Sequence, residues 1–193
     1  MSNLYEINPL YLLPAFVLVV GVINAYNFMD GINGILGLYA LTVLALLFHD
    51  GFALDGHSYP FVFLVFSLFS FLFYNLRSKA KVFSGDVGSL SISYLLIGGL
   101  VNMLLEDRTY VTGFQFMLLF LLPVSIFFMD SFTTILHRLW IRENIFLSHR
   151  FHLYQIITPG IIKSQLSVSI AYALFQMVLT FLFLNLTNVV STS

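Results

Sequence analysis

The sequence predicts an all-α protein: a polytopic membrane helix bundle of about six transmembrane helices, forming a single domain over residues 1–193. Two features of the composition lead to this prediction. Hydrophobic residues make up 59% of the chain and charged residues only 9%, whereas an ordinary soluble domain carries about 25% charged residues. The mean hydropathy is +0.94. In addition, long apolar stretches recur along the chain, separated by short segments with Gly, Pro or charged residues.

Six apolar stretches account for most of the chain. A spanning helix needs about 20 predominantly apolar residues, so the last two stretches are long enough and the first two are short. Short spans are expected where a helix ends against protein or a water-filled site instead of lipid. The predicted spans are residues 9–24, 34–48, 59–76, 87–105, 113–136 and 165–187.

The basic residues gather on one side of this predicted bundle, since seven of the eight Lys and Arg residues follow the third and fifth spans. Cytoplasmic loops carry the excess of Lys and Arg. We therefore expect residues 24–34, 77–89 and 137–163 to face the cytoplasm, both termini to lie outside, and the protein to be a multi-pass protein of the cell inner (plasma) membrane with a cytoplasmic active face. The chain has no Cys, which excludes disulfides and thiolate chemistry, and its start does not predict a signal peptide.

The first predicted cytoplasmic segment is unusually polar for its depth. Polar side chains within a membrane are costly unless they have partners or a function, so we interpret this segment as a binding site. The alternative is a helix–helix contact through small residues, in which the amides form interhelical hydrogen bonds. The segment holds Asn24, Asn27, Asp30 and Asn33 together with Gly31 and Gly34.

The second segment places Asp86 at a predicted helix start, within the sequence Ser-Gly-Asp-Val-Gly-Ser of residues 84–89. Glycines let a backbone approach a ligand closely, and free amides at a helix start suit anionic oxygens. A carboxylate there could hold Mg²⁺, which keeps its other positions for water and phosphate. The alternative is that Asp86 is only an N-cap and that the glycines form a turn.

The third segment contains His149, Arg150 and His152. The spacing could suit Zn²⁺, but no further ligands of the usual kind are near. Recognition of a diphosphate fits better, because Arg offers a planar fork of donors and a protonated His adds charge. The alternative is a juxtamembrane loop that binds lipid headgroups. Asp130, inside the fifth predicted span, is a functional candidate because it is a carboxylate at membrane depth. The alternative, an equally good interpretation, is that it pairs with a polar neighbour to position a helix, and we keep it as a supporting residue.

Together the three segments resemble the polyprenyl-phosphate N-acetylhexosamine-1-phosphate transferases, the WecA- and MraY-like enzymes of glycosyltransferase family 4. Residues 24–34 resemble the family signature N-x-x-N-x-x-D-G-[ID]-[DN]-G, and residues 83–89 resemble its loop F-x-G-D-x-G-S. Residues 130–155 resemble its last cytoplasmic loop, in the form closest to enzymes that start O-antigen and capsule-type cell-surface glycans.

The resemblance implies transfer of a sugar 1-phosphate, expected to be N-acetylhexosamine 1-phosphate, from a UDP-sugar to undecaprenyl phosphate or another polyprenyl phosphate, with release of UMP. It also implies Mg²⁺ as cofactor, with Mn²⁺ as an alternative. Carried over to this sequence, the metal ligands would be Asp86 and Asn27, the substrate-binding residues Asn24, Asp30, Asn33 and Arg150, and the catalytic residues Asp86, His149, Arg150 and His152.

One family motif has no counterpart: members carry an earlier D-D-x-x-D, and no Asp-Asp dipeptide occurs in this chain. We therefore expect the C-terminal portion of such an enzyme, with membrane lipids and either the missing N-terminal portion or a second copy as further partners. The alternative function is a truncated, inactive remnant or accessory membrane subunit that binds polyprenyl phosphate or a partner enzyme. A transporter fits less well, because the polar residues lie on one surface without a repeat. Nucleic-acid binding is not supported, because the basic loops are short.

Overall fold

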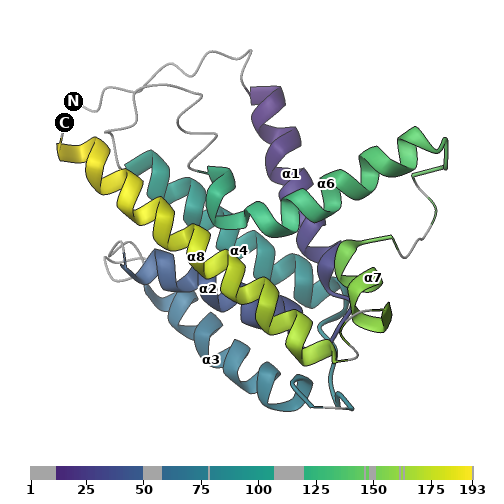
Figure 1. Cartoon of the computed structure of the whole chain (residues 1–193). Coiled ribbons are helices and arrows are strands. Elements are labelled where there is room, and N and C mark those ends of the chain that lie inside the picture. Colours follow the sequence, from purple (N-terminus) through teal and green to yellow (C-terminus); the bar gives the residue numbers. More distant parts are fainter. Residues whose placement is uncertain are drawn as a thin grey trace.

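The computed structural model describes residues 12–49, 58–77, 79–106, 120–145, 147, 151–160, 162 and 164–192. All regular secondary structure within these ranges is helical, which confirms the predicted all-α membrane fold (Figure 1). The elements are α1 (Leu12–Met29), α2 (Ile35–His49), α3 (Ser58–Asn75), α4 (Gly85–Glu106), the short 3-10 helix η2 (Leu122–Val124), α6 (Ser125–Trp140), α7 (Leu153–Gly160) and α8 (Gln165–Thr192).

Three of the described helices contain a stretch long and apolar enough to cross a membrane: Leu12–Met29, Gly85–Met103 and Gln165–Leu182. Two further apolar stretches, Ile35–His49 and Tyr59–Asn75, are shorter. A span needs about 20 residues, so α2, with 15 residues, must be enclosed by protein over part of its length.

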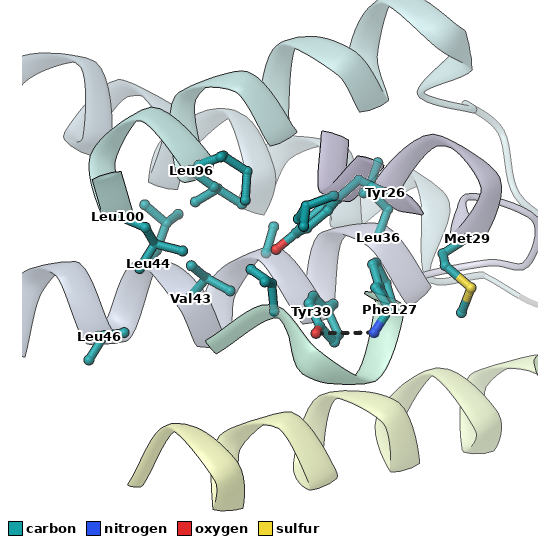
Figure 2. Packing of buried hydrophobic residues seen from close by; sticks show 14 of the residues in the cluster. Tyr26, Met29, Leu36, Tyr39, Val43, Leu44, Leu46, Leu96, Leu100 and Phe127 are labelled. Carbon is teal, nitrogen blue, oxygen red and sulfur yellow. Dashed lines mark hydrogen bonds between the residues drawn. The ribbon is translucent and has the colours of Figure 1, made fainter. Parts of the chain in front are cut away.

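Helix α2 lies at the centre of the bundle and packs against α8, α3 and α4. It is apolar around most of its circumference, as expected of a helix that protein covers on most sides. Tyr39, Val43 and Leu46 of α2 are fully buried. Figure 2 shows them in one cluster with Tyr26 of α1 and Phe127 of α6. The rings of Tyr39 and Phe127 are stacked with centroids 3.6 Å apart.

The stretch predicted as one span over residues 113–136 is not one continuous helix in its described part. Residues 122–124 form a 3-10 turn, and α6 starts only at Ser125. Pro123 within the turn has no backbone N–H and clashes with a preceding helical carbonyl, so it interrupts the helix. From this break α6 crosses α1, against which it packs, and its C-terminal part extends away from the other helices (Figure 1).

The start of α6 is capped by side chains from two other helices. The Ile126 N–H donates to Gln176 Oε1 of α8 at 3.3 Å, and the Phe127 N–H donates to the Tyr39 hydroxyl of α2 at 3.3 Å. Tyr39 in turn donates to Gln176 Oε1. Amide groups at a helix start have no partner within the helix and must be satisfied where water is excluded. These contacts therefore make the break tolerable inside the bundle.

Two other boundaries differ from the sequence prediction. Helix α1 continues to Met29, so Asn24 and Asn27 lie in its last turns and not in a loop. Asn24 fits the helix because its side-chain amide donates to the carbonyl of Val20, one turn earlier, at 2.8 Å. A short helix, α7, also forms within the predicted loop 137–163 and packs against α8.

Candidate functional site

The turn between α1 and α2 is held by backbone and side-chain bonds to other segments. The Asn33 side-chain amide donates to the Arg77 carbonyl at 2.8 Å. The Asn33 backbone N–H donates to Gln165 Oε1 at 3.2 Å, and its carbonyl accepts a bond from Ser169 Oγ at 2.7 Å. Asn33, predicted to bind substrate, is thus also a junction between the α1–α2 turn, the α3–α4 connection and α8.

Asn75, at the end of α3, is a site-organising residue that the sequence analysis did not identify. It is buried. Its Oδ1 accepts a bond from the Gly34 N–H at 2.6 Å, and its Nδ2 donates to the Val82 carbonyl at 2.8 Å. Gly34 has a φ of +83°, which a glycine adopts without steric cost. A lone amide at the end of an apolar helix was the only available signal in the sequence.

The first and second predicted segments meet at the start of α4. The Ser84 hydroxyl donates to Asp30 Oδ2, and the Ser89 hydroxyl donates to Asn27 Oδ1 at 2.9 Å. Asp86 lies in the first turn of α4 and is exposed. The structure therefore brings Asp30 and Asn27 from one segment to the helix start that carries Asp86. Asn24 bonds within its own helix and does not join this group.

The electrostatics of this group come from two acidic side chains. Burial raises the pKa of Asp30, the hydrogen bond from Ser84 opposes that rise, and the negative charge of Asp86 raises the pKa further. The two carboxylates therefore repel each other across the α1–α4 contact. A cation between or beside them would relieve this repulsion.

The third predicted segment is described only in part, and His149 and Arg150 lie outside the described residues. His152 is buried, with 3% of its surface exposed. Its ring stacks with that of Phe28 at the end of α1 and with that of Tyr154 in α7, at centroid distances of 6.2 and 5.9 Å. His152 therefore packs directly on the first segment.

Tyr154 fixes the third segment to the first. Its hydroxyl donates to the Phe28 carbonyl at 3.2 Å, and it accepts a bond from Gln155 Nε2 at 3.0 Å. A Cβ on Gly31 would lie 2.0 Å from the Tyr154 hydroxyl, so the contact requires a glycine at that position. The close packing of Tyr154 therefore explains why a glycine follows Asp30 in this segment.

The charges around Tyr154 show that it lies near both acidic groups. Burial raises its pKa, the bond from Gln155 opposes the rise, and the negative charges of Asp130 and Asp30 raise the pKa further. The charges of Asp30 and of the buried Asp130 therefore both act on Tyr154.

Arg138, at the end of α6, organises the chain that leads towards residues 149 and 150. It is buried, and its Nε donates to Glu143 Oε2 at 3.1 Å. Its other nitrogens donate to the carbonyls of Asn144 (2.6 Å), Ile145 (3.3 Å) and Leu147 (3.0 Å). The side chain acts as a structural scaffold for an irregular loop, whose carbonyl groups it satisfies.

The donor set at the start of α4 fits Mg²⁺. Among the residues that the structure describes, no three His, Asp or Glu side chains gather in the manner of a transition-metal site. Mg²⁺ has another requirement, because it is commonly held by one or two carboxylates and completes its shell with water and substrate phosphates. The carboxylate of the exposed Asp86 and the amide oxygen of Asn27, the two ligands that the family resemblance implies, are oxygen donors of that kind.

Comparison with known proteins gives a consistent result. The profile of glycosyl transferase family 4 matches residues 2–104 of the chain. The phospho-N-acetylmuramoyl-pentapeptide-transferase of Dictyoglomus thermophilum is 28% identical over 146 residues, which cover 74% of this chain and 44% of that protein. The decaprenyl-phosphate N-acetylglucosaminephosphotransferase of Mycobacterium leprae is 31% identical over 163 residues, which cover 74% of this chain and 40% of that protein. The chain spans less than half the length of these relatives.

Proposed function

We propose, from the premise that the chain belongs to glycosyl transferase family 4, that it carries the cytoplasmic site of an enzyme that transfers a sugar 1-phosphate from a UDP-sugar to a polyprenyl phosphate. Its relatives are phosphosugar transferases by name, and the names of two of them, from Bacillus subtilis and Mycobacterium leprae, specify undecaprenyl phosphate and decaprenyl phosphate. We take the sugar to be an N-acetylhexosamine, and the product to initiate a cell-surface glycan.

The reaction exchanges one phosphorus–oxygen bond for another. An oxygen of the polyprenyl phosphate attacks the phosphorus that carries the sugar, and the bond from that phosphorus to the bridging oxygen breaks. UMP leaves with the bridging oxygen, and the product is a polyprenyl diphosphate sugar. Both reactants are anionic, so the protein's main tasks are positioning and charge stabilisation.

The observation that carries the proposal is the meeting of two distant segments at the start of α4. The bonds from Ser84 to Asp30 and from Ser89 to Asn27 join residues that are 54 and 62 positions apart. They create an acidic, oxygen-rich group beside the exposed amide end of a helix, which suits a metal-bound nucleotide diphosphate. In the proposal, Asp30 and Asn33 bind the nucleotide end of the substrate. Asn24, one to two turns before the end of α1, contributes to the same binding.

Asp86 and Asn27 would hold Mg²⁺, or Mn²⁺ in its place. The ion, when bound, neutralises charge on the diphosphate oxygens and orients them. His149, Arg150 and His152 would bind the diphosphate and sugar from the third segment. Arg138 supports that role, because it fixes the chain just before these residues.

The carrier lipid explains why a site for a soluble nucleotide is built into membrane helices: its hydrocarbon chain stays in the bilayer beside them. We place the site on the cytoplasmic face of the inner membrane, because seven of the eight Lys and Arg residues fall on the site side of the predicted topology. The further proposed partners are membrane lipids and either a segment that supplies the acidic pair of the family or a second copy of the chain.

The test is transfer of radiolabelled N-acetylglucosamine 1-phosphate from its UDP form to undecaprenyl phosphate, in membranes that contain the inserted chain. Transfer should depend on added Mg²⁺, and Asp86→Asn should lower it by about a hundredfold or more. Ser91→Ala, an exposed position on the same helix, is the matched control and should leave the rate unchanged. Equal rates for Asp86→Asn and wild type would refute the assignment of Asp86.

The second candidate is an accessory membrane subunit that binds polyprenyl phosphate or a partner enzyme. If the inserted chain transfers none of several UDP-sugars but retains polyprenyl phosphate in detergent, this candidate replaces the enzyme.

A further inference from the structure

Asp130 of α6 joins three helices through one buried carboxylate. Its Oδ2 accepts a bond from the Tyr172 hydroxyl of α8 at 2.7 Å. Its Oδ1 accepts a bond from the backbone N–H of Leu153, the first residue of α7, at 2.9 Å. Asp130 is only 6% exposed. A carboxylate that accepts several bonds in a buried position is held firmly in one orientation.

The same carboxylate faces the ring of His152. His152 Nδ1 lies 3.4 Å from Asp130 Oδ1 and 3.4 Å from Thr134 Oγ1. The Thr134 hydroxyl already donates to the Asp130 carbonyl at 2.8 Å, so its oxygen presents a lone pair to the ring. An ionised carboxylate is an acceptor only. Asp130 Oδ1 and Thr134 Oγ1 therefore both act as acceptors towards Nδ1, and these two contacts favour a ring proton on Nδ1.

The ring is fixed in its plane as well as in its protonation. It stacks with Phe28, which belongs to the first segment, and with Tyr154, which bonds to the Phe28 carbonyl. Asp130 thus fixes the direction in which Nδ1 points, and the stacking contacts with Phe28 and Tyr154 fix the plane of the imidazole ring. As a result, the orientation of His152 is defined relative to the segment that carries Asp30.

We propose that Asp130, anchored by Tyr172, is a positioning residue of the site: it holds His152 with the proton on Nδ1 and fixes the first turn of α7. The effect of this positioning on catalysis rests on the proposed function, whereas the effect on the His152 ring does not. The competing explanation is that Asp130 only ties α6, α7 and α8 together. The two differ because only the first makes the state of the His152 ring depend on the Asp130 charge.

Asp130→Asn separates the two explanations. Asn can still accept the Leu153 N–H, and its amide can face Tyr172 or the ring, so the helices retain bonds while the charge is lost. Nitrogen-15 NMR of the histidine-labelled full chain in nanodiscs reports the ring protonation, and the His152 signals are assigned by their loss in His152→Gln. We expect a protonated Nδ1 in the wild type and loss of this preference in Asp130→Asn. A wild-type ring protonated on Nε2 alone, or an unchanged ring in Asp130→Asn, would overturn the proposal.

The transfer assay tests whether the positioning of His152 affects the rate of the reaction. Asp130→Asn should lower kcat about tenfold or more with little change in KM for the UDP-sugar, and Tyr172→Phe should do the same to a smaller extent. Thr133→Ala, an exposed position on α6 that bonds only within its own helix, should change neither. An unaltered kcat per folded Asp130→Asn chain would refute positioning. If wild type transfers no sugar phosphate, the proposed function fails, and the NMR result alone decides the role of Asp130.

Discussion

Replacing Tyr39 by Phe removes a hydroxyl group that connects three helices. The hydroxyl donates to Gln176 of α8 and accepts the N–H of Phe127 in α6 (Figure 2 shows the second bond). Tyr26 provides a matched control in the same cluster, with its ring 5.6 Å from that of Tyr39 and also fully buried. Within the described part of the chain, the Tyr26 hydroxyl has no hydrogen-bond partner. The same chemical change should therefore have opposite effects at the two positions.

The expected magnitudes follow from these contacts. Side-chain hydrogen bonds in a membrane bundle contribute on average about 0.6 kcal/mol each, and a buried donor deprived of its acceptor costs about 1–3 kcal/mol. Tyr39→Phe loses two bonds and removes this acceptor from the Phe127 N–H, so we expect a loss of about 2–4 kcal/mol. Tyr26→Phe removes an unpaired buried hydroxyl, so we expect a gain of up to about 1 kcal/mol.

The free energy of unfolding can be measured by SDS titration of the chain in mild detergent, with helicity followed by far-ultraviolet circular dichroism. The decisive quantity is the difference between the two variants, because errors in the reference state cancel. Equal destabilisation by the two substitutions would refute the reasoning, since Tyr26 would then have a stabilising partner of its own.

Three further predictions concern the site and the topology. Gly31→Ala should break the Tyr154 contact and lower both stability, by about 1–3 kcal/mol, and transfer. Gly21→Ala, where a Cβ meets nothing within 4 Å, should lower neither in the same two assays. The chain has no Cys, so each single-Cys variant has one labelling site. Lys79→Cys should react with an impermeant maleimide only from the cytoplasmic side, and Asp55→Cys only from outside. The reverse pattern would show that the topology is the opposite of the one predicted. Removal of divalent metal with EDTA should abolish transfer, and added Mg²⁺ should restore it, whereas a metal-independent rate would contradict the proposed role of the ion.

The fold class could be predicted because it depends on properties averaged over the whole chain, namely its apolar composition and the distribution of its basic residues. The break before α6 could not, because Pro123 lies within a continuous apolar stretch, and prolines are tolerated in membrane helices when neighbours satisfy the freed groups. Those neighbours, Tyr39 and Gln176, are far away in sequence. The predicted span ended at residue 24 because the polar residues begin there, although the Asn24 amide bonds within the helix, which continues to Met29.

At the site, the meeting of the first two segments was predictable from the topology, and the bond between Ser84 and Asp30 agrees with it. The catalytic and metal-binding roles of Asp86, His149, Arg150 and the other assigned residues stay predictions. The partners of Asp130 could not be read from the sequence, since Tyr172 lies 42 residues away on a helix without any motif. Side-chain pairs of this kind depend on helix rotation, which an almost uniformly apolar sequence specifies only weakly.

The bond between the Tyr154 hydroxyl and the Phe28 carbonyl has a thermodynamic consequence. It makes the end of α1 and the start of α7 a single unit, so a ligand that restricts one also restricts the other. The entropy lost on ordering this unit is then lost once, at the first binding event. Two reactants that contact different ends of the unit would therefore bind with positive cooperativity, whichever of them arrives first.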